Sequence, residues 1–225
     1  MRVRVLVYNV KSFRSGVHSV AEVVAPYRPD IALINECGPR RRLRRFARSL
    51  HMDALAHHYL FRKSIHNAVL VRPPWRVLQH RLHPFPKDAR RVPRGVLLAR
   101  IGRAGTRLWA LSVHLGLHPG SRRRNAEELT GLVFSLPEPV VVGGDLNEGP
   151  EGKAATWLAE RLWDAWAHVG EGDGETFPSR DPTARIDYLF VSAESGIEDA
   201  ITVQTPAAAR ASDHLPLLVD LTTAR

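Results

Sequence analysis

Hydrophobic and polar residues alternate along much of this chain, and the pattern predicts many strands with a few amphipathic helices between them. Residues 2–10 place Val3, Val5 and Val7 on one face, which indicates a first strand. The unbroken β-branched run at residues 140–142 indicates a strand that is buried on both faces. Further strands are expected at residues 31–36, 67–72, 75–82, 95–101, 107–114, 185–191, 197–205 and 215–221, and helices at residues 17–27, 40–50, 121–136 and 152–162.

This order of elements predicts one α/β domain over residues 1–225, because no repeat, low-complexity tract or linker divides the chain. Six arginines cover the polar surface of the helix expected at residues 40–50. Ser121 is the expected N-cap of the helix that follows it. The proline-rich segment 83–94 is expected to be an exposed basic loop.

The strand at residues 140–142 runs directly into two glycines, an acid and an amide. Gly143 and Gly144 allow the backbone to turn sharply or to approach a ligand closely. If the strand geometry continues past them, Asp145 and Asn147 point to the same side of the chain. These residues also suit an ordinary polar turn, so the rest of the chain has to distinguish a turn from half of a site.

Polar residues recur where other apolar strands end. Asp187 lies inside the apolar run 186–190, where an unpaired charge would be costly. A single strand-end acid or core histidine is usually structural, but six such sites in one chain indicate that they form a shared functional site. Besides Asp187, these sites are Asn9, Glu36, His114, the pair Asp145 and Asn147, and the pair Asp213 and His214.

Positive charge is concentrated in one half of the chain. The net charge is +9, but residues 1–112 hold 23 Lys and Arg against 5 Asp and Glu, whereas residues 113–225 hold 9 against 18. A strongly positive face suits a polyanion such as nucleic acid. An arginine-rich composition explains the charge equally well, because 28 of the 32 basic residues are Arg.

The candidate site has the donor types of a phosphoester hydrolase. Carboxylate and amide oxygens without cysteines suit hard Mg²⁺ or Mn²⁺. Histidines beside acids add groups that can move protons. Beside a positive surface, this combination indicates attack of water on a phosphoester. A Rossmann-type nucleotide binder is excluded, because no Gly-rich phosphate turn follows Gly143 and Gly144.

Cysteine and hydropathy patterns limit the cellular setting. The single cysteine, Cys37, excludes an internal disulfide and fits a reducing compartment. No apolar run approaches the ~18 residues of a membrane span, and Arg4 interrupts the apolar core that a signal peptide would need. A cytoplasmic, monomeric protein without a membrane span is therefore expected.

Seven short motifs follow one another along nearly the whole chain. They are Tyr8-Asn9-Val10, Asn35-Glu36, Asn67-Ala-Val-Leu-Val-Arg72, Ser112-Val-His114-Leu, Gly144-Asp145-Leu146-Asn147, Arg185-Ile-Asp187-Tyr188 and Ser212-Asp213-His214. The Gly-Asp-Leu-Asn and Ser-Asp-His elements, with Arg-Ile-Asp-Tyr between them, are the most specific. In this order the motifs resemble those of a known family, the endonuclease/exonuclease/phosphatase superfamily with its deoxyribonuclease I-like fold. The resemblance implies a four-layer α/β/β/α sandwich with two packed mixed β-sheets.

The resemblance also implies roles around a metal ion and a proton-transfer group. Glu36 and Asn9 would hold the divalent metal, Mg²⁺ or Mn²⁺, with Asp213 close enough to contribute. His214 would be the general base or an electrostatic partner of the transition state. Asp187 would orient the His214 imidazole, as in a catalytic triad.

Five further residues receive roles on the substrate. Asp145 would position or deprotonate the attacking water, and Asn147 would donate a hydrogen bond to the phosphoryl oxygens. His114 would bind the phosphate from the other side and could assist the leaving group. Asn67 and Arg122 are expected to bind substrate, although a scaffold hydrogen bond explains Asn67 better.

The chain departs from the family pattern at His114. Deoxyribonuclease I pairs its equivalent histidine with a glutamate from an earlier strand. Here no Asp or Glu occurs between Asp53 and Asp88, so the chain offers His114 no such partner there. Residues 176–178 are expected to be a loop anchor.

The preferred substrate is DNA. A compact nuclease or phosphodiesterase fits the basic segments at residues 40–48, 87–94 and 122–124. A phosphatase or phosphodiesterase for a small or lipid phosphoester, such as an inositol phosphatase or a sphingomyelinase, is the competing enzyme. A binding module without catalysis is a third class, but binding alone does not require Asp187 behind His214.

Overall fold

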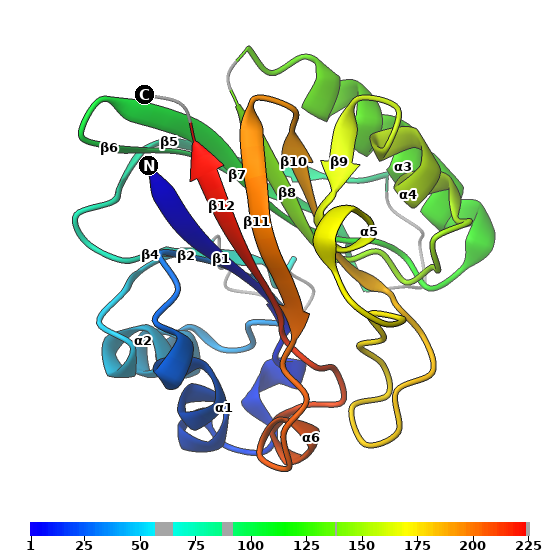
Figure 1. Cartoon of the computed structure of the whole chain (residues 1–225). Helices are drawn as coiled ribbons and strands as arrows, with labels where there is room; N and C mark the ends of the chain where they lie inside the picture. Colours follow the sequence, from blue (N-terminus) through cyan, green and yellow to red (C-terminus); the bar gives the residue numbers. More distant parts are fainter. Residues whose placement is uncertain (57–64, 87–91, 138, 224–225) are drawn as a thin grey trace.

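The computed structural model describes residues 1–56, 65–86, 92–137 and 139–223, which form two β-sheets packed face to face (Figure 1). Both sheets are mixed, because each combines a parallel strand pair with antiparallel pairs. Helices lie on the outer face of each sheet, which gives four layers. The expected four-layer sandwich is confirmed.

The first sheet contains the strands nearest the two ends of the chain. Its strands are β1 (Arg2–Asn9), β2 (Ile31–Asn35), β3 (Asp53–Ala56), β4 (Ala68–Val71), β11 (Ser195–Thr202) and β12 (Leu217–Thr223). They lie in the order β11-β12-β1-β2-β4-β3. The parallel pair β1 and β2 occupies the centre, so both strands deliver their carboxyl ends to the same edge.

The second sheet is formed by the middle of the chain. Its strands are β5 (Arg76–Pro84), β6 (Gly95–Arg103), β7 (Thr106–His114), β8 (Val140–Asp145), β9 (Leu162–Asp164) and β10 (Asp187–Ser192). They lie in the order β5-β6-β7-β8-β10-β9. Strands β7 and β8 are parallel and β10 is antiparallel to β8, so β10 begins where β7 and β8 end.

The helices divide between the outer faces. Helices α1 (Val17–Val24), α2 (Arg40–Ser49) and α6 (Ala208–Ala211) cover the first sheet, and α3 (Pro119–Phe134) and α4 (Lys153–Leu158) cover the second. The short α5 (Ala165–Val169) contacts β10 and β11 and so bridges the two sheets at one edge. Short 3₁₀ turns occur at Lys11–Phe13 and Ala25–Tyr27.

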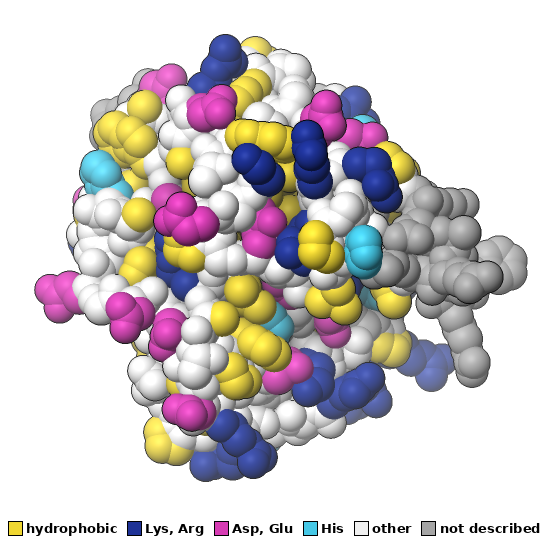
Figure 2. Space-filling view, turned by 90° about the vertical axis from the view of Figure 1, so that its right-hand side faces the viewer, with side chains coloured by type: hydrophobic (Ala, Val, Ile, Leu, Met, Phe, Trp, Pro, Cys, Tyr) yellow, Lys and Arg dark blue, Asp and Glu magenta, His cyan; other side chains and the backbone are white. Residues whose placement is uncertain are grey.

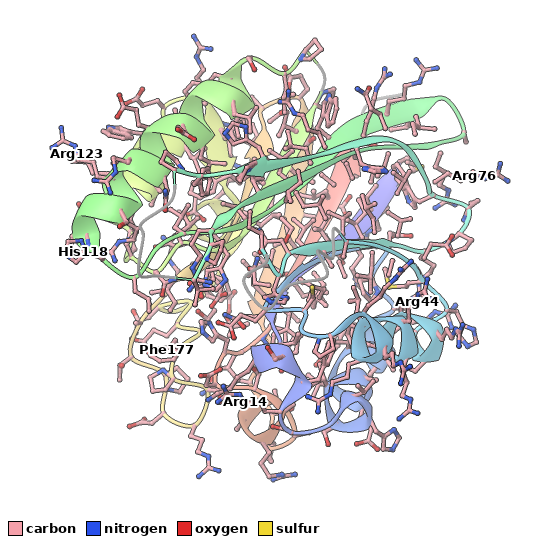
Figure 3. The ribbon with its side chains drawn as sticks, turned by 180° about the vertical axis from the view of Figure 1, so that it is seen from behind. Arg14, Arg44, Arg76, His118, Arg123 and Phe177 are labelled. Carbon is pink, nitrogen blue, oxygen red and sulfur yellow. The ribbon has the colours of Figure 1, made fainter. Side chains whose placement is uncertain are left out.

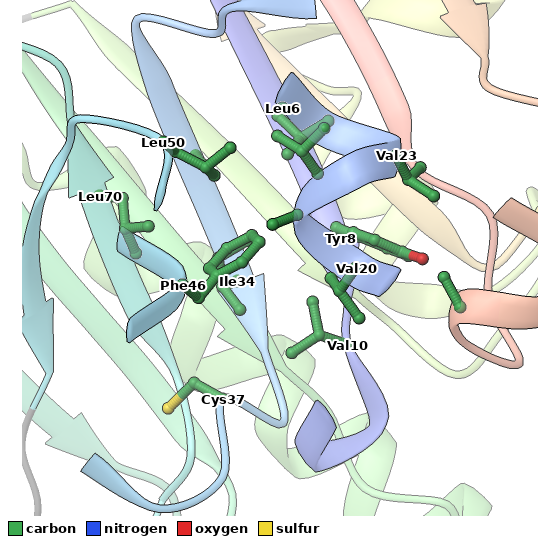
Figure 4. Close-up of a cluster of buried hydrophobic side chains, with 14 of the residues drawn as sticks. Leu6, Tyr8, Val10, Val20, Val23, Ile34, Cys37, Phe46, Leu50 and Leu70 are labelled. Atoms are coloured by element: carbon green, nitrogen blue, oxygen red, sulfur yellow. The ribbon is translucent and has the colours of Figure 1, made fainter. Parts of the chain in front are cut away.

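Three hydrophobic layers hold the sandwich together. The middle layer lies between the sheets and contains the alternate valines of β1, Val3, Val5 and Val7. The opposite face of β1 carries Leu6 and Tyr8 into the outer layer beneath α1 and α2 (Figure 4). Because successive strand residues point to opposite faces, one alternating strand supplies two layers of core.

The two glycines of β8 are required by close packing within the sandwich. A Cβ atom at Gly143 would lie 2.6 Å from Val7 Cγ2. Gly144 has a φ of 152°, and a Cβ atom there would collide with the carbonyl oxygen of Val113. The glycines therefore let β8 lie close against its neighbours.

Some local predictions were wrong. His118, not Ser121, is the N-cap of α3, and Ser121 is buried inside the helix. The segment 83–94 is not simply exposed, because Phe85 is buried and its amide donates to the Arg94 carbonyl. Residues 87–91 of that segment lie outside the described residues. The elements β3, β9, α5 and α6 were not predicted.

Acidic and basic side chains are interspersed on the face shown in Figure 2, where no single sign of charge prevails. Although the first half of the chain is strongly basic, this side of the molecule is not uniformly basic. Among the helices in the described part of the chain, none has the length and apolar character needed to cross a membrane.

Candidate active site

The two sheets bring polar residues together at one end of the sandwich. In the second sheet, strand register places His114 beside Asp145, and Asp145 beside Asp187, in one row across three strands. In the first sheet, Asn9 lies beside Asn35 at the ends of β1 and β2. The predicted strand-end cluster therefore arises from the register of both sheets.

Asp145 is the centre of the cluster and is almost completely buried. Its Oδ2 accepts a hydrogen bond from Asn9 Nδ2 at 3.0 Å and lies 3.1 Å from His114 Nε2. Its Oδ1 accepts from the backbone N–H of Asn147 at 2.9 Å. The His214 ring nitrogen Nε2 lies 3.8 Å from Oδ2. One carboxylate thus joins residues from both sheets.

His214 is held from behind by a buried acid. Its Nδ1 lies 2.8 Å from Oδ2 of Asp187, and the same oxygen accepts a 2.7 Å hydrogen bond from Thr176 Oγ1. The Phe177 ring lies against the imidazole, with ring centroids 5.0 Å apart. The loop residues 176 and 177 therefore fix both the acid and the plane of the histidine ring.

These contacts shift the protonation of the buried groups. Burial alone disfavours the imidazolium form of His214, but the carboxylates of Asp187 and Asp145 outweigh it and raise the pKa of His214 to about 9. Burial would likewise raise the pKa of Asp145, but its interactions with the two histidine rings hold that pKa well below the usual range. At neutral pH, His214 is protonated and Asp145 is ionised.

A second network of buried amides joins the sheets immediately beneath the cluster. Asn35 accepts the backbone N–H of Asp145 at 2.9 Å and donates to the Val113 carbonyl at 2.8 Å. Asn67 donates to the carbonyls of Gly95 and Ser112 at 2.8 and 2.9 Å. Both amides are buried, so each satisfies backbone groups that water cannot reach.

His114 has a basic partner on the side away from Asp145. Its Nδ1 lies 2.9 Å from Nη1 of Arg94, the residue that precedes β6. Both residues line a cavity of about 260 Å³ together with Glu36, His66 and Asn67. Among the described residues, no hydrogen bond or ion pair engages the Glu36 carboxylate, which leaves it open to a cation.

The prediction for Asn147 depended on continued strand geometry, and that condition is not met. Strand β8 ends at Asp145, and Asn147 has a left-handed φ of 54°. Its backbone N–H turns back to Asp145, while its side-chain Nδ2 donates to the Leu115 carbonyl at 3.0 Å. Asn147 still lies at the cluster, but a turn and not a strand places it there.

Left-handed backbone conformations gather around the cluster. Lys11, Ser12 and Phe13 follow Asn9 with φ values of 44°, 54° and 54°, and Glu36 has a φ of 47°. Such conformations cost about 1–3 kcal/mol each in non-glycine residues and persist where the surroundings impose them. Here the Ser12 N–H donates to the Glu36 carbonyl at 2.8 Å, which ties the two segments together.

Two predicted residues are engaged elsewhere. The Asp213 carboxylate forms an ion pair with Lys11 at 2.7 Å, so its Oδ2 already faces a cation. Arg122 pairs with Glu148 at 3.1 Å and donates to the Leu117 carbonyl at 2.6 Å. The guanidinium of Arg122 therefore holds two loops together beside the cluster.

The central acids and histidine could themselves hold a metal ion. One potential ligand atom from each of Asp145, Asp187 and His214 lies within 4.8 Å of the others. Two of these residues already contact each other, because His214 Nδ1 lies 2.8 Å from Asp187 Oδ2. The structure thus offers two candidate metal positions, this buried group and the open carboxylate of Glu36.

The sequence matches the model of a known protein family. The model of the Endonuclease/Exonuclease/phosphatase family matches residues 6–214. The chain belongs to this family. Members of the family are phosphoester hydrolases that generally depend on a divalent metal. The resemblance inferred from the motifs is therefore confirmed, and no curated protein matches the chain.

Several solved structures share the family fold. An endonuclease/exonuclease/phosphatase from Bacteroides vulgatus is 17% identical, with a TM-score of 0.84 and 100% of both chains covered. D. rerio TDP2 complexed with a single strand DNA product is 17% identical, with a TM-score of 0.82 and 99% of each chain covered. Bacteroides thetaiotaomicron mannosyl-6-phosphatase is 18% identical, with a TM-score of 0.79, and the match covers 98% of this chain and 99% of that one. At these identities the likeness establishes the fold alone.

The site residues predicted from the sequence did not include three residues that complete the cluster. Thr176 fixes Asp187, Asn35 fixes the Asp145 backbone, and Arg94 contacts His114. Asn35 could have been found as the last residue of a buried strand. Arg94 carried no such signal, because it stood among several arginines of a loop.

Basic side chains extend from separate elements around the sandwich. Figure 3 shows Arg14, Arg44 and Arg123 projecting outward, from the segment before α1, from α2 and from α3. Phe177, which packs on His214, lies between the labelled Arg14 and His118 in this view. Positive charges thus surround the body of the molecule at several separate points.

Proposed function

We propose that the protein is a divalent-metal-dependent phosphodiesterase that cleaves DNA by attack of water on phosphorus. The observation that carries this proposal is the buried Asp145 carboxylate, which contacts Asn9 and His114 and lies beside the His214–Asp187 pair. Membership of a family of phosphoester hydrolases supports the reaction class. DNA is favoured by the basic first half of the chain.

Asp145 is the residue that positions the water. Two partners occupy its Oδ2, namely Asn9 and His114, whereas within the described part of the chain Oδ1 accepts only the Asn147 N–H. A carboxylate oxygen can accept two hydrogen bonds, so Oδ1 keeps one acceptor position for water. A low pKa makes Asp145 a weak base at neutral pH, and orientation of the nucleophile is therefore its main contribution.

His214 and Asn147 act on the phosphoryl group. The raised pKa of His214 favours the imidazolium form, which supports electrostatic stabilisation of the transition state over a general-base role. Asp187 keeps the imidazole in place through its 2.8 Å contact with Nδ1. The side-chain amide of Asn147 uses one hydrogen on Leu115 and has a second for a phosphoryl oxygen.

Glu36 and Asn9 are the proposed metal ligands. The carboxylate of Glu36 lines a cavity and forms no ion pair among the described residues, although Arg94 lines the same cavity. The Asn9 amide lies on the neighbouring strand. Their oxygen donors suit Mg²⁺ or Mn²⁺. The ion would supply charge stabilisation to the phosphoryl oxygens. Asp213 is the less suitable ligand, because Lys11 already neutralises it.

Cleavage assays test this function directly. Plasmid, single-stranded DNA and RNA would each be incubated with Mg²⁺ or with EDTA. We expect DNA to be cleaved in the presence of Mg²⁺ and to remain intact in EDTA. His214→Ala should abolish it, whereas His18→Ala, which alters an exposed histidine on α1, should not. No metal-dependent cleavage of any of the three substrates would overturn the nuclease proposal.

A phosphatase acting on a small phosphoester is the second candidate. The cavity beside His114 holds only about 260 Å³ and is lined by Glu36 and Arg94, which suits a single phosphate group. The similar fold of a mannosyl-6-phosphatase shows that the sandwich accommodates such activity in another protein. Release of inorganic phosphate from sugar phosphates, nucleotides or inositol phosphates, without DNA cleavage, would favour this alternative.

A further inference from the structure

The His114 imidazole lies between a cation and an anion. Its Nδ1 is 2.9 Å from Nη1 of Arg94, and its Nε2 is 3.1 Å from Oδ2 of Asp145. The ring is buried, with only 3% of the residue exposed. Both ring nitrogens are therefore assigned to protein partners.

The chemistry of these partners determines where the proton lies. A guanidinium has donors and no acceptor, so Nδ1 of His114 has to present its lone pair to Arg94. An ionised carboxylate has acceptors and no donor, so Nε2 has to carry the hydrogen that points to Asp145. Only the neutral imidazole with hydrogen on Nε2 satisfies both contacts.

We propose that Arg94 is a positioning residue that locks His114 in this neutral tautomer and makes it a fixed donor to Asp145. The locked ring has no spare hydrogen for a leaving group and no spare lone pair for a proton. His114 is thereby excluded as a leaving-group acid, although the family resemblance gave it that possible role. The tautomer follows from the contacts alone, whereas its catalytic consequence rests on the proposed phosphoester hydrolysis.

The backbone around Arg94 is built to hold this contact. Strand register places Gly95 directly beside His114, so the preceding residue reaches the far edge of the imidazole. The Arg94 carbonyl accepts the Phe85 N–H at 2.9 Å, and the Gly95 carbonyl accepts Asn67 Nδ2 at 2.8 Å. Two hydrogen bonds on consecutive carbonyls fix the direction in which the Arg94 side chain departs.

The lock gives Nδ1 of His114 a basic partner, Arg94, where deoxyribonuclease I has an acidic one. An acid at Nδ1 would bind a hydrogen and favour the imidazolium, whereas Arg94 excludes a proton at the same atom. The His114 ring donates a hydrogen bond to Asp145 through Nε2. That contact holds the Asp145 carboxylate in a fixed position.

Imidazole nitrogen NMR on the full chain tests the lock without requiring turnover. Spectra of ¹⁵N-labelled protein in EDTA at pH 7.5, with His114 assigned by comparison with His114→Gln, are expected to show the neutral form protonated on Nε2. Arg94→Met should abolish that signature, and Arg94→Lys, which retains a cationic donor, should restore it in part. An imidazolium, or hydrogen on Nδ1, in the wild-type protein would overturn the proposal.

Kinetics then test what the lock does. With bis-p-nitrophenyl phosphate as substrate, Arg94→Met should lower kcat about 10- to 100-fold with little change in KM, as is typical when a partner that orients an active-site group is removed. Arg76→Met, which removes an exposed arginine from β5, is the control for loss of charge and should leave both constants unchanged (Figure 3).

A double variant separates positioning from direct substrate contact. The Gln side chain in His114→Gln can donate to Asp145 but has no tautomer to control. In that background Arg94→Met should cause no further loss of kcat. An equal loss in both backgrounds, or a raised KM with an unchanged tautomer, would show that Arg94 acts on substrate and would overturn the proposal. Absence of any turnover would contradict the proposed function and leave the NMR result standing.

Discussion

Replacing Asp187 by Asn should change how the stability of the protein depends on pH. The difference between a pKa of about 9 and the ordinary 6.5 for His214 corresponds to about 3 kcal/mol of stabilisation at low pH. The folded pKa is the higher one, so this stabilisation is complete below pH 6.5 and is lost as the pH rises through about 9. Asp187→Asn removes the closest carboxylate, because Asp187 lies 2.8 Å from the ring.

The measurement is urea unfolding of both proteins in EDTA at pH 6.0, 7.5 and 9.5. We expect Asp187→Asn to lower the free energy of unfolding by up to about 3 kcal/mol at pH 6.0 and by much less at pH 9.5. Asp145 also raises the pKa of His214, so the loss should fall somewhat short of the full value.

Asp220→Asn provides a matched control. Asp220 pairs with Arg4 at 2.6 Å, and this partner lowers the pKa of Asp220. Both members of that pair stay charged throughout the pH range of the experiment, so the variant should produce a constant offset. An equally constant offset for Asp187→Asn would refute the argument that Asp187 stabilises a charged His214.

Three further variants test the metal position and the packing. Glu36→Gln should weaken Mn²⁺ binding at least tenfold by calorimetry, whereas Asp213→Asn should weaken it less, and the reverse order would assign the metal to Asp213. Asn35→Ala should lower the free energy of unfolding by about 2–4 kcal/mol, because it leaves the buried Asp145 N–H and the Val113 carbonyl unpaired. A loss below about 1 kcal/mol would show that these two groups do not need Asn35 as their partner. Gly144→Ala should greatly reduce the yield of folded protein or lower its melting temperature, since the added methyl collides with Val113, and a wild-type melting temperature would show that β8 can shift.

The sequence predicted the strands well where one pattern dominated. The unbroken apolar run of β8 and the alternating run of β1 are unambiguous patterns, and both strands begin where the sequence predicted. Short elements such as β9 (Leu162–Asp164) were not predicted, because three residues are too few to show a periodic pattern. Ser121 was a reasonable cap by type, but the helix begins earlier with Pro119.

The candidate site was predictable to the extent that it followed strand ends. His114, Asp145 and Asp187 meet because neighbouring strands share a register, which strand-end polar residues can indicate. The partner of His114 was not predictable, because Arg94 reaches it across the sheet from a strand whose pairing the sequence does not specify. The turn at Asn147 was one of two alternatives that the sequence left open, because its left-handed conformation depends on the hydrogen bond to Asp145.

The buried amide of Asn35 has a mechanical consequence. Asn35 belongs to the first sheet, but its side chain hydrogen-bonds the backbone of Asp145 and Val113 in the second sheet. If one sheet slid along the other, these hydrogen bonds would break and the candidate catalytic groups would be displaced at the same time. The protein should therefore have no partly opened state that remains active, and activity in urea should disappear in step with unfolding of the sandwich.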